Sequence, residues 1–145
     1  MSAESKGFRF LEHMTDAEIE AFGSNINEAF EHAGRAVEDL MVDLQSVKPL
    51  KVREIRLEEK DLGSLLYSWI ESLISFQDSE GLLFSKFSCK IKKSGNAFSL
   101  HAKVLGEKFN PQKHEQKTAI KAPTYHDMKI SESPKRVTLR FLVDL

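Results

Sequence analysis

Residues 61–106, DLGSLLYSWIESLISFQDSEGLLFSKFSCKIKKSGNAFSLHAKVLG, decide the fold class. Behind Asp61, leucines, isoleucines and Trp69 recur at spacings of three and four, which predicts an amphipathic helix capped by Asp61. We predict a turn at 79–81 and then strands over 82–93 and 97–106, joined by a second turn at 93–96. This arrangement favours an α+β domain over a doubly wound parallel sheet.

The segments on either side of this stretch add one more helix and several strands. Alternating apolar residues predict two short strands around 8–10 and 19–21. Ser24 is the expected N-cap of a helix over about 25–44, whose apolar residues repeat at helical spacing. A strand is expected around 52–57, another around 119–130, and a last one from Val137 to the C-terminus. In the last strand, one face is expected to carry Val137, Leu139, Phe141 and Val143, and the other Thr138, Arg140, Leu142 and Asp144.

The length of 145 residues fits one compact domain. The predicted fold class is therefore α+β, with residues 1–145 forming a single domain and residues 1–6 a disordered N-terminus. We expect a mixed, largely antiparallel sheet of about seven strands, together with the two amphipathic helices.

The charge is distributed unevenly along the chain. Residues 1–85 carry 8 Lys/Arg and 17 Asp/Glu, whereas residues 86–145 carry 13 Lys/Arg and 5 Asp/Glu. The formal net charge is only −1. Near-neutrality argues against a generic polycation that coats nucleic acid or membrane.

Several classes of protein are excluded or disfavoured by what the sequence lacks. No apolar run approaches the roughly 20 residues that span a bilayer, and the first residues, Met-Ser-Ala-Glu-Ser-Lys, lack the apolar core of a signal peptide. We expect a cytoplasmic protein with no membrane partner. The single Cys89 cannot form an intramolecular disulfide and is expected to be a packed or surface thiol. No standard nucleophile, zinc-binding or phosphate-loop motif is present, which counts against an enzyme.

Three polar groups could nevertheless carry function. The first is the short segment from His13 to Asp16, although a turn whose Asp accepts main-chain hydrogen bonds is the simpler interpretation of this signal alone. The second is the loop and strand start over 106–126, which holds several lysines and histidines. That segment could face an anion or an acidic partner, or it could be solvated surface with one or two hydrogen-bonded histidines.

The third group is the C-terminus. Asp144 places a carboxylate beside the α-carboxylate of Leu145. Such oxygen-rich clusters suit Ca²⁺, Mg²⁺ or Mn²⁺, although a frayed acidic terminus is the simpler interpretation of this signal alone.

Taken together and in order, these elements resemble the archease family. The matching motifs are His13-Met14-Thr15-Asp16 with Gly23, Gly106-Glu107, His114, Lys121-Ala122-Pro123-Thr124-Tyr125-His126 and Asp144-Leu145. The sequence departs from the family pattern at Pro123, where valine is common. Because proline lacks a backbone N–H, we predict an interruption of strand pairing just before Tyr125.

The resemblance implies a non-catalytic accessory protein of the RtcB-type RNA-splicing ligase, which joins tRNA halves using GTP and Mn²⁺. It implies that the protein promotes guanylylation of the ligase and its multiple turnover, meeting tRNA only through the ligase and having no small-molecule substrate of its own. It also implies a divalent cation, Ca²⁺ in isolation or alternatively Mn²⁺ or Mg²⁺, held by Asp16, Asp144 and Leu145. The residues expected to face the partner or support the site are His13, Glu107, His114, Lys121, Thr124, Tyr125 and His126.

Asp16 and Asp144 can meet only if their strands are neighbours, and we predict that they are. Three alternatives stay open at this stage. They are an RNA-binding module that uses the basic segment 86–129, a chaperone-like modulator, and a metal-dependent phosphoesterase that uses the two aspartates.

Overall fold

The computed structural model describes residues 6–11 and 16–145. Its elements, in chain order, are β1 (Phe8–Leu11), β2 (Asp16–Gly23), α2 (Ile26–Met41), the short 3-10 helix η1 (Leu44–Ser46), β3 (Lys51–Glu59), α3 (Leu62–Glu80), β4 (Leu82–Ser94), β5 (Ala97–Lys108), β6 (Ala122–Ser133) and β7 (Arg136–Asp144).

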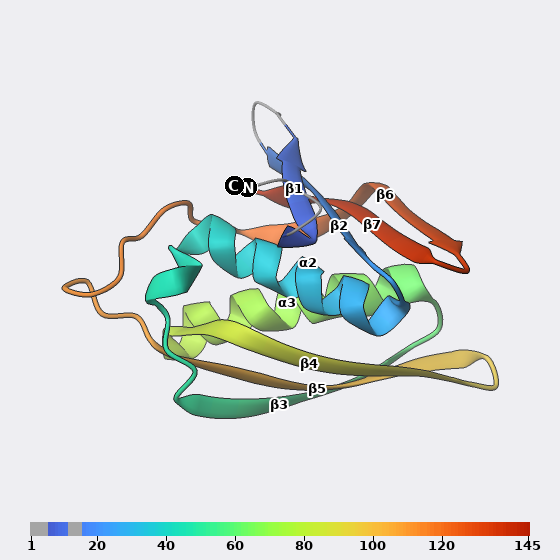
Figure 1. Ribbon diagram of the computed structural model, residues 1–145, viewed down its shortest axis with the longest axis horizontal. Helices are drawn as coiled ribbons and strands as arrows, with labels where there is room; N and C mark the ends of the chain where they lie inside the picture. The colour runs from blue at the N-terminus through green and yellow to red at the C-terminus, as the bar shows by residue number, and fades with distance from the viewer. Residues whose placement is uncertain (1–5, 12–15) are drawn as a thin grey trace.

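The two long helices lie between two β-sheets (Figure 1). One sheet has four strands in the order β1-β2-β7-β6, and the other has three in the order β3-β5-β4. The α+β class with two long helices and seven strands is confirmed. The expectation of one mixed sheet is wrong in two respects, because the strands form two sheets and every pairing is antiparallel.

Helix α2 begins and ends differently from the prediction. Its N-cap is Asn25, not Ser24, because the Asn25 side chain accepts the Glu28 N–H at 2.9 Å. Ser24 instead donates its main-chain N–H to the Glu28 carboxylate at 2.9 Å, so the helix start is fixed by reciprocal bonds. The helix ends at Met41, and Leu44 lies in η1 rather than in the same helix.

Helix α3 follows the prediction more closely. Asp61 accepts the Ser64 N–H at 2.7 Å, which confirms it as the N-cap. The helix continues through Glu80, two residues into the predicted turn, and Gly81 ends it in the left-handed conformation at φ 66°. Trp69 is fully buried and donates its indole N–H to the Phe30 carbonyl at 2.9 Å, which ties α3 to α2.

One long edge of β4 is covered by side chains of α2. Asn27, Glu31 and Glu38 accept the main-chain N–H groups of Ile91, Cys89 and Phe84 at 2.9, 2.8 and 3.1 Å. Side-chain oxygens thus replace the neighbouring strand that this edge lacks. An edge covered in this way is protected from pairing with another chain.

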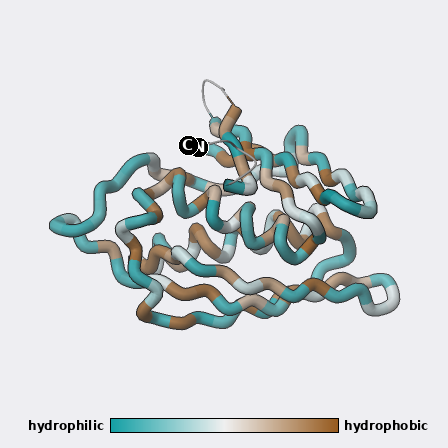
Figure 2. The backbone as a smooth tube through the Cα atoms, viewed as in Figure 1, coloured by the Kyte–Doolittle hydropathy of each residue, from teal (hydrophilic) through white to brown (hydrophobic). Residues whose placement is uncertain are grey.

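The hydrophobic core lies between the layers. Figure 2 shows apolar residues along the helices and strands and polar residues along the connection 109–121. Cys89 is buried in this core, which confirms the packed-thiol interpretation. Among the described helices, none is both long and apolar enough to cross a membrane.

Candidate metal centre and its surroundings

Asp16 and Asp144 lie directly opposite each other at the end of a shared ladder. Strands β2 and β7 pair without interruption from Asp16↔Asp144 to Gly23↔Val137. The prediction that these two strands are neighbours is therefore confirmed. Residues in direct register project from the same face of a sheet with Cβ atoms about 5 Å apart.

The alternation of each strand explains why both carboxylates face outward. Ile19 and Ala21 on β2, like Phe141 and Val143 on β7, point inward and are buried. The residues between them face away from the helices. Asp16 is half-buried in this position, Asp144 is exposed, and Leu145 is 37% exposed.

The other carboxylates in the same row of β2 lie near arginines. Glu18 is bonded to Arg140 at 2.9 Å, and Glu20 to Arg9 at 2.9 Å. Opposite Asp16 the register places a second carboxylate, that of Asp144. Two anions in direct register repel each other, and a cation bound between them would reduce that repulsion.

The start of β6 forms the third side of this corner. Lys121 donates its main-chain N–H to the Asp144 carbonyl at 2.8 Å, and Ala122 is in register with Asp144. Thr124 pairs with Leu142, one row further along the same face. Thr124 therefore lies on the face that carries the two aspartates, whereas Lys121 contacts Asp144 through its main-chain N–H.

The donor set of this corner consists entirely of oxygens. Two side-chain carboxylates and the terminal carboxylate of Leu145 are the ligand types that Ca²⁺, Mg²⁺ and Mn²⁺ prefer. Within residues 6–11 and 16–145, no group of three His, Cys, Asp or Glu side chains that could hold a metal ion forms. His13 lies outside the described residues.

Glu107 and His114 form a separate cluster that holds the loop after β5. One Glu107 carboxylate oxygen accepts the main-chain N–H of Lys48 at 2.8 Å, the ammonium of Lys113 at 2.6 Å and the ring nitrogen Nε2 of His114 at 2.9 Å. Burial alone would raise the pKa of Glu107. The bonds from Lys113, Lys48 and His114 outweigh that effect and lower the pKa from 4.5 to about 2.

The hydrogen bonds of His114 also fix its tautomer. Its Nδ1 accepts the Asn110 N–H at 2.9 Å, so the ring proton is on Nε2 and is donated to Glu107. The His114 side chain has 0% exposure. Of the two interpretations given for this loop, the structure matches a hydrogen-bonded histidine that supports it.

Gly106 is required where β5 passes β4. A Cβ on Gly106 would lie 1.7 Å from the Leu83 carbonyl oxygen, beside the irregularity between Phe84 and Lys86. Only glycine permits this close approach, and it places Glu107 next to the loop that it holds.

Tyr125 and His126 lie on a bulge of strand β6. Pairing with β7 runs through Thr124 and resumes at Lys129, with Asp127 in the left-handed region at φ 56°. The interruption begins at Tyr125, one residue later than predicted from Pro123, which itself still pairs with Val143. Tyr125 is 54% exposed and stacks on Tyr67, with 4.4 Å between ring centroids, while His126 is exposed beside Asp127.

Sequence reasoning missed two functional-looking groups. The polar residues of α2 that cover β4 were not identified, because polar residues on a helix normally indicate a solvent face. The row formed by Arg56, His101 and Lys90 across the three-stranded sheet was also missed, since its members come from distant segments. Alternation of lysines at positions 86, 90 and 92 was the available signal for that face.

Comparison with known proteins shows similarity over nearly the whole chain. Residues 8–145 match the model of the Archease protein family (MTH1598/TM1083). The archease of Sulfurisphaera tokodaii is 47% identical over 95% of this chain and 98% of its own length, and that of Thermococcus kodakarensis is 44% identical over 92% and 95%. The solution structure of Methanobacterium thermoautotrophicum protein 1598 has 34% identity and a TM-score of 0.85, covering 97% of this chain and 99% of its own. A crystal structure from Thermotoga maritima, described as an archease and possible chaperone, shares the fold with a TM-score of 0.60 and 20% identity, covering 93% of this chain and 94% of its own.

Proposed function

The chain belongs to the archease family, and we propose that it acts as a non-catalytic accessory protein of an RtcB-type RNA-splicing ligase. In this proposal it promotes the GTP-dependent guanylylation of the ligase and allows multiple turnover in tRNA splicing. The observation that supports it most directly is the register of Asp16 with Asp144 beside the C-terminus.

Asp16, Asp144 and the terminal carboxylate of Leu145 are the residues that would hold a divalent cation. Their all-oxygen donor set fits Ca²⁺, Mn²⁺ or Mg²⁺. When bound, such a cation would supply positive charge that neutralises and orients phosphate groups.

Exposed residues of β6, the strand beside β7, suit contact with a partner protein. Tyr125 and His126 are exposed on the β6 bulge, and the Tyr67 ring supports Tyr125 from behind. A supported aromatic side chain is a typical anchor of protein interfaces. The exposed Lys121 follows the same edge and could pair with a phosphate or a carboxylate of the partner.

Glu107 and His114 contribute in a different way. Their bonds hold the loop at 109–121, whose end donates the main-chain N–H of Lys121 to Asp144. We assign them the role of fixing the approach to β6 rather than contacting the ligase.

The decisive test is a ligation assay with substoichiometric ligase and limiting GTP. The protein should raise product beyond one turnover per ligase, and Asp16→Asn and Asp144→Asn should each lose most of this effect. Asp78→Asn, an exposed change of the same kind on α3, should behave as the unchanged protein. No increase beyond one turnover would rule out the proposal.

Two further assays separate the competing functions. Suppressed aggregation of unrelated unfolded proteins, with ligase turnover unchanged, would replace the proposal by a chaperone-like role. Hydrolysis of model phosphates by the pure protein, abolished by Asp16→Asn, would replace it by a phosphoesterase.

Binding of the cation is tested separately by calorimetry with Ca²⁺ and Mn²⁺. A C-terminal extension, which moves the α-carboxylate away, should weaken binding. Unchanged affinity would remove Leu145 from the donor set and leave the two aspartates.

A further inference from the structure

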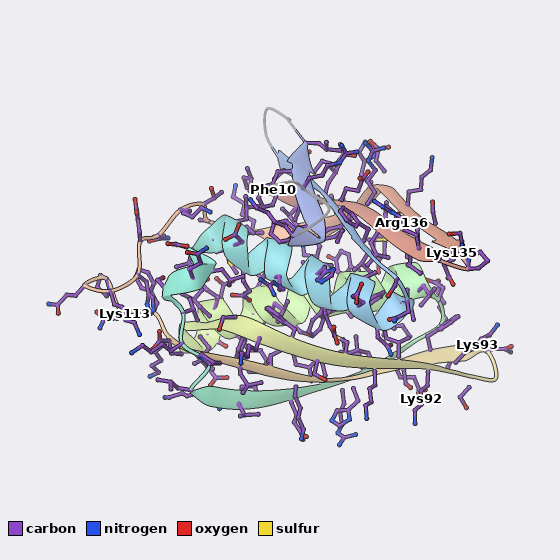
Figure 3. All side chains as sticks on the ribbon, viewed as in Figure 1. Phe10, Lys92, Lys93, Lys113, Lys135 and Arg136 are labelled. Atoms are coloured by element: carbon purple, nitrogen blue, oxygen red, sulfur yellow. The ribbon has the colours of Figure 1, made fainter. Side chains whose placement is uncertain are left out.

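The outer face of the β3-β5-β4 sheet is strongly basic. Lys86, Lys90 and Lys92 on β4, Lys103 on β5 and Arg56 on β3 are all exposed on this face. We call this set, together with His101, the basic face. It lies on the side of the sheet away from the helices, where Figure 3 labels Lys92 below the ribbon.

The charges of the basic face are concentrated on two of its strands. The two carboxylates on this face, Glu54 and Glu58, both lie on β3. From β4 and β5 this face carries four lysines, His101, three serines, Ala97 and Leu105. Glu107 follows in the same alternation at the end of β5, where it is bonded to Lys113 and His114. Over the rest of the face, the acidic residues are confined to the β3 edge.

Two cationic side chains flank His101 on this face. Arg56 on β3 and Lys90 on β4 are each in register with His101, which lies between them on β5. The His101 ring also lies 3.4 Å from the Glu54 carboxylate. A polyanion lying across the three strands would be attracted by both cations.

A shallow depression lies over the same residues. It has a volume of about 550 Å³ and is lined by Arg56, Lys90, Lys92, Ser99 and His101 among others. Lysines at alternate positions of one strand are spaced about 7 Å apart, so Lys90 and Lys92 can contact successive anionic groups of an extended chain.

The composition of the face favours nucleic acid over an acidic protein. Protein interfaces are enriched in aromatic residues and methionine and depleted in lysine, whereas this face has four lysines and neither aromatic residues nor methionine among its outward side chains. Lysines without stacking aromatics bind the phosphate backbone and read no bases.

We propose that the basic face is a docking surface for the phosphate backbone of RNA. The choice of RNA over DNA rests on the proposed function, because the partner there is an RNA ligase; the need for phosphates rests on the face itself. The aspartate corner is on the other sheet, so one side of the molecule can contact the ligase while the other contacts its RNA.

The experiment measures binding of a fluorescently labelled RNA hairpin to this protein alone, by anisotropy over a series of salt concentrations. We expect a dissociation constant of the order of 10⁻⁵ M near 0.1 M salt, and a logarithmic salt slope of about 3 to 4, as for four or so phosphate contacts. The triple variant Lys86→Gln, Lys90→Gln, Lys92→Gln should bind at least about 10-fold more weakly and lose about 2.7 from the slope.

The matched control is the triple variant Lys48→Gln, Lys129→Gln, Lys135→Gln. It makes the same charge change with exposed lysines outside the basic face, and Figure 3 shows Lys135 at the turn between β6 and β7. It should retain the affinity and slope to within about twofold. Thermal unfolding of both variants confirms that each is folded.

The outcomes distinguish this inference from the proposed function. Equal loss in both triple variants, or no RNA binding by the unchanged protein, would overturn it. Equal binding of a DNA hairpin would overturn the assignment to RNA, and binding of polyglutamate with the same affinity would favour an acidic protein instead. Ligase stimulation that survives without RNA binding would leave the proposed function standing, and RNA binding without stimulation would leave only this inference.

Discussion

The carboxylate of Glu107 should make a large, pH-dependent contribution to stability, which the variant Glu107→Gln would remove. Three donors converge on one of its oxygens, from Lys48, Lys113 and His114. A glutamine keeps the shape and one accepting oxygen but loses the charge. The prediction is that the folded state loses the charge-assisted part of these bonds.

The magnitude follows from the lowered pKa. A pKa of about 2 in place of 4.5 corresponds to about 3 kcal/mol at neutral pH, at ~1.4 kcal/mol for each tenfold change in proton affinity. The side chain of Lys113 is 34% exposed, and screening by solvent reduces the expected effect to about 2 kcal/mol.

The direction in which stability changes with pH depends on whether the folded or the unfolded state holds the Glu107 proton more tightly. Because the folded pKa lies below the unfolded one, the stabilisation is present above pH 4.5 and disappears as the pH falls toward 2. Urea unfolding of both proteins at a series of pH values measures this. The difference between them should be about 2 kcal/mol at pH 7 and close to zero near pH 2.

The control is Glu132→Gln, which changes an exposed carboxylate on β6. It should shift the free energy of unfolding by less than about 0.5 kcal/mol. A Glu107→Gln effect that is the same at every pH would show that packing rather than charge is involved, and no effect at pH 7 would refute the reasoning. Amide exchange of His114, whose N–H is bonded to the Asn110 carbonyl at 2.7 Å, should be faster in Glu107→Gln if the loop is loosened.

Three further changes test other parts of the molecule. If the aspartate corner binds Ca²⁺, a concentration 100 times the dissociation constant should raise the free energy of unfolding by about 2.7 kcal/mol, and Asp16→Asn should abolish this rise in urea titrations. Burial raises the pKa of Glu38 well above 4.5, against the opposing effect of the bond from the Phe84 N–H. The free energy of unfolding should therefore fall as the pH rises from 4.5 toward the folded pKa, and Glu38→Gln should remove this pH dependence. The same pH dependence in both proteins would contradict the prediction. Glu31→Leu should lower the free energy of unfolding by about 1–3 kcal/mol, because the buried Cys89 N–H loses its acceptor. Glu31→Gln, which keeps an accepting oxygen, should lower it less. Equal effects of the two changes would refute a hydrogen-bonding role for Glu31.

The elements themselves could be predicted because their signals are local. Asp61 and the apolar repeat behind it identify α3, and strict alternation identifies β7. The N-cap of α2 was misplaced by one residue because Ser24 and Asn25 are both good caps. Their roles are decided by which of them accepts the Glu28 N–H.

The division into two sheets could not be predicted from alternation. Period-two patterning shows which face of a strand is buried but not which strand lies beside it. The pairing of β2 with β7 was predicted only because the resemblance to the archease family required Asp16 to lie near Asp144. No comparable constraint applied to β3, whose pairing with β5 brings Arg56 from the acidic half of the chain beside His101.

The burial of certain polar residues also could not be predicted from the sequence. Glu38 lies among polar residues of α2, and the sequence therefore predicts an exposed side chain. It has 0% exposure in the structure because it lies against the edge of β4. His114 reads as a surface residue in a lysine-rich loop, yet both its ring nitrogens are bonded within the protein. In both cases a long-range partner, invisible in the local sequence, makes burial favourable.

The uneven charge of the chain is largely evened out by strand pairing. Each sheet combines strands from the acidic first half with strands from the basic second half, and bonds such as Arg140–Glu18 and His101–Glu54 cross between the halves. Pairing also brings some like charges near each other, with Asp16 opposite Asp144 in one sheet and Arg56 and Lys90 on either side of His101 in the other. A cation bound at the first place, or a polyanion at the second, would reduce the repulsion between these side chains, and that reduction would add to its affinity.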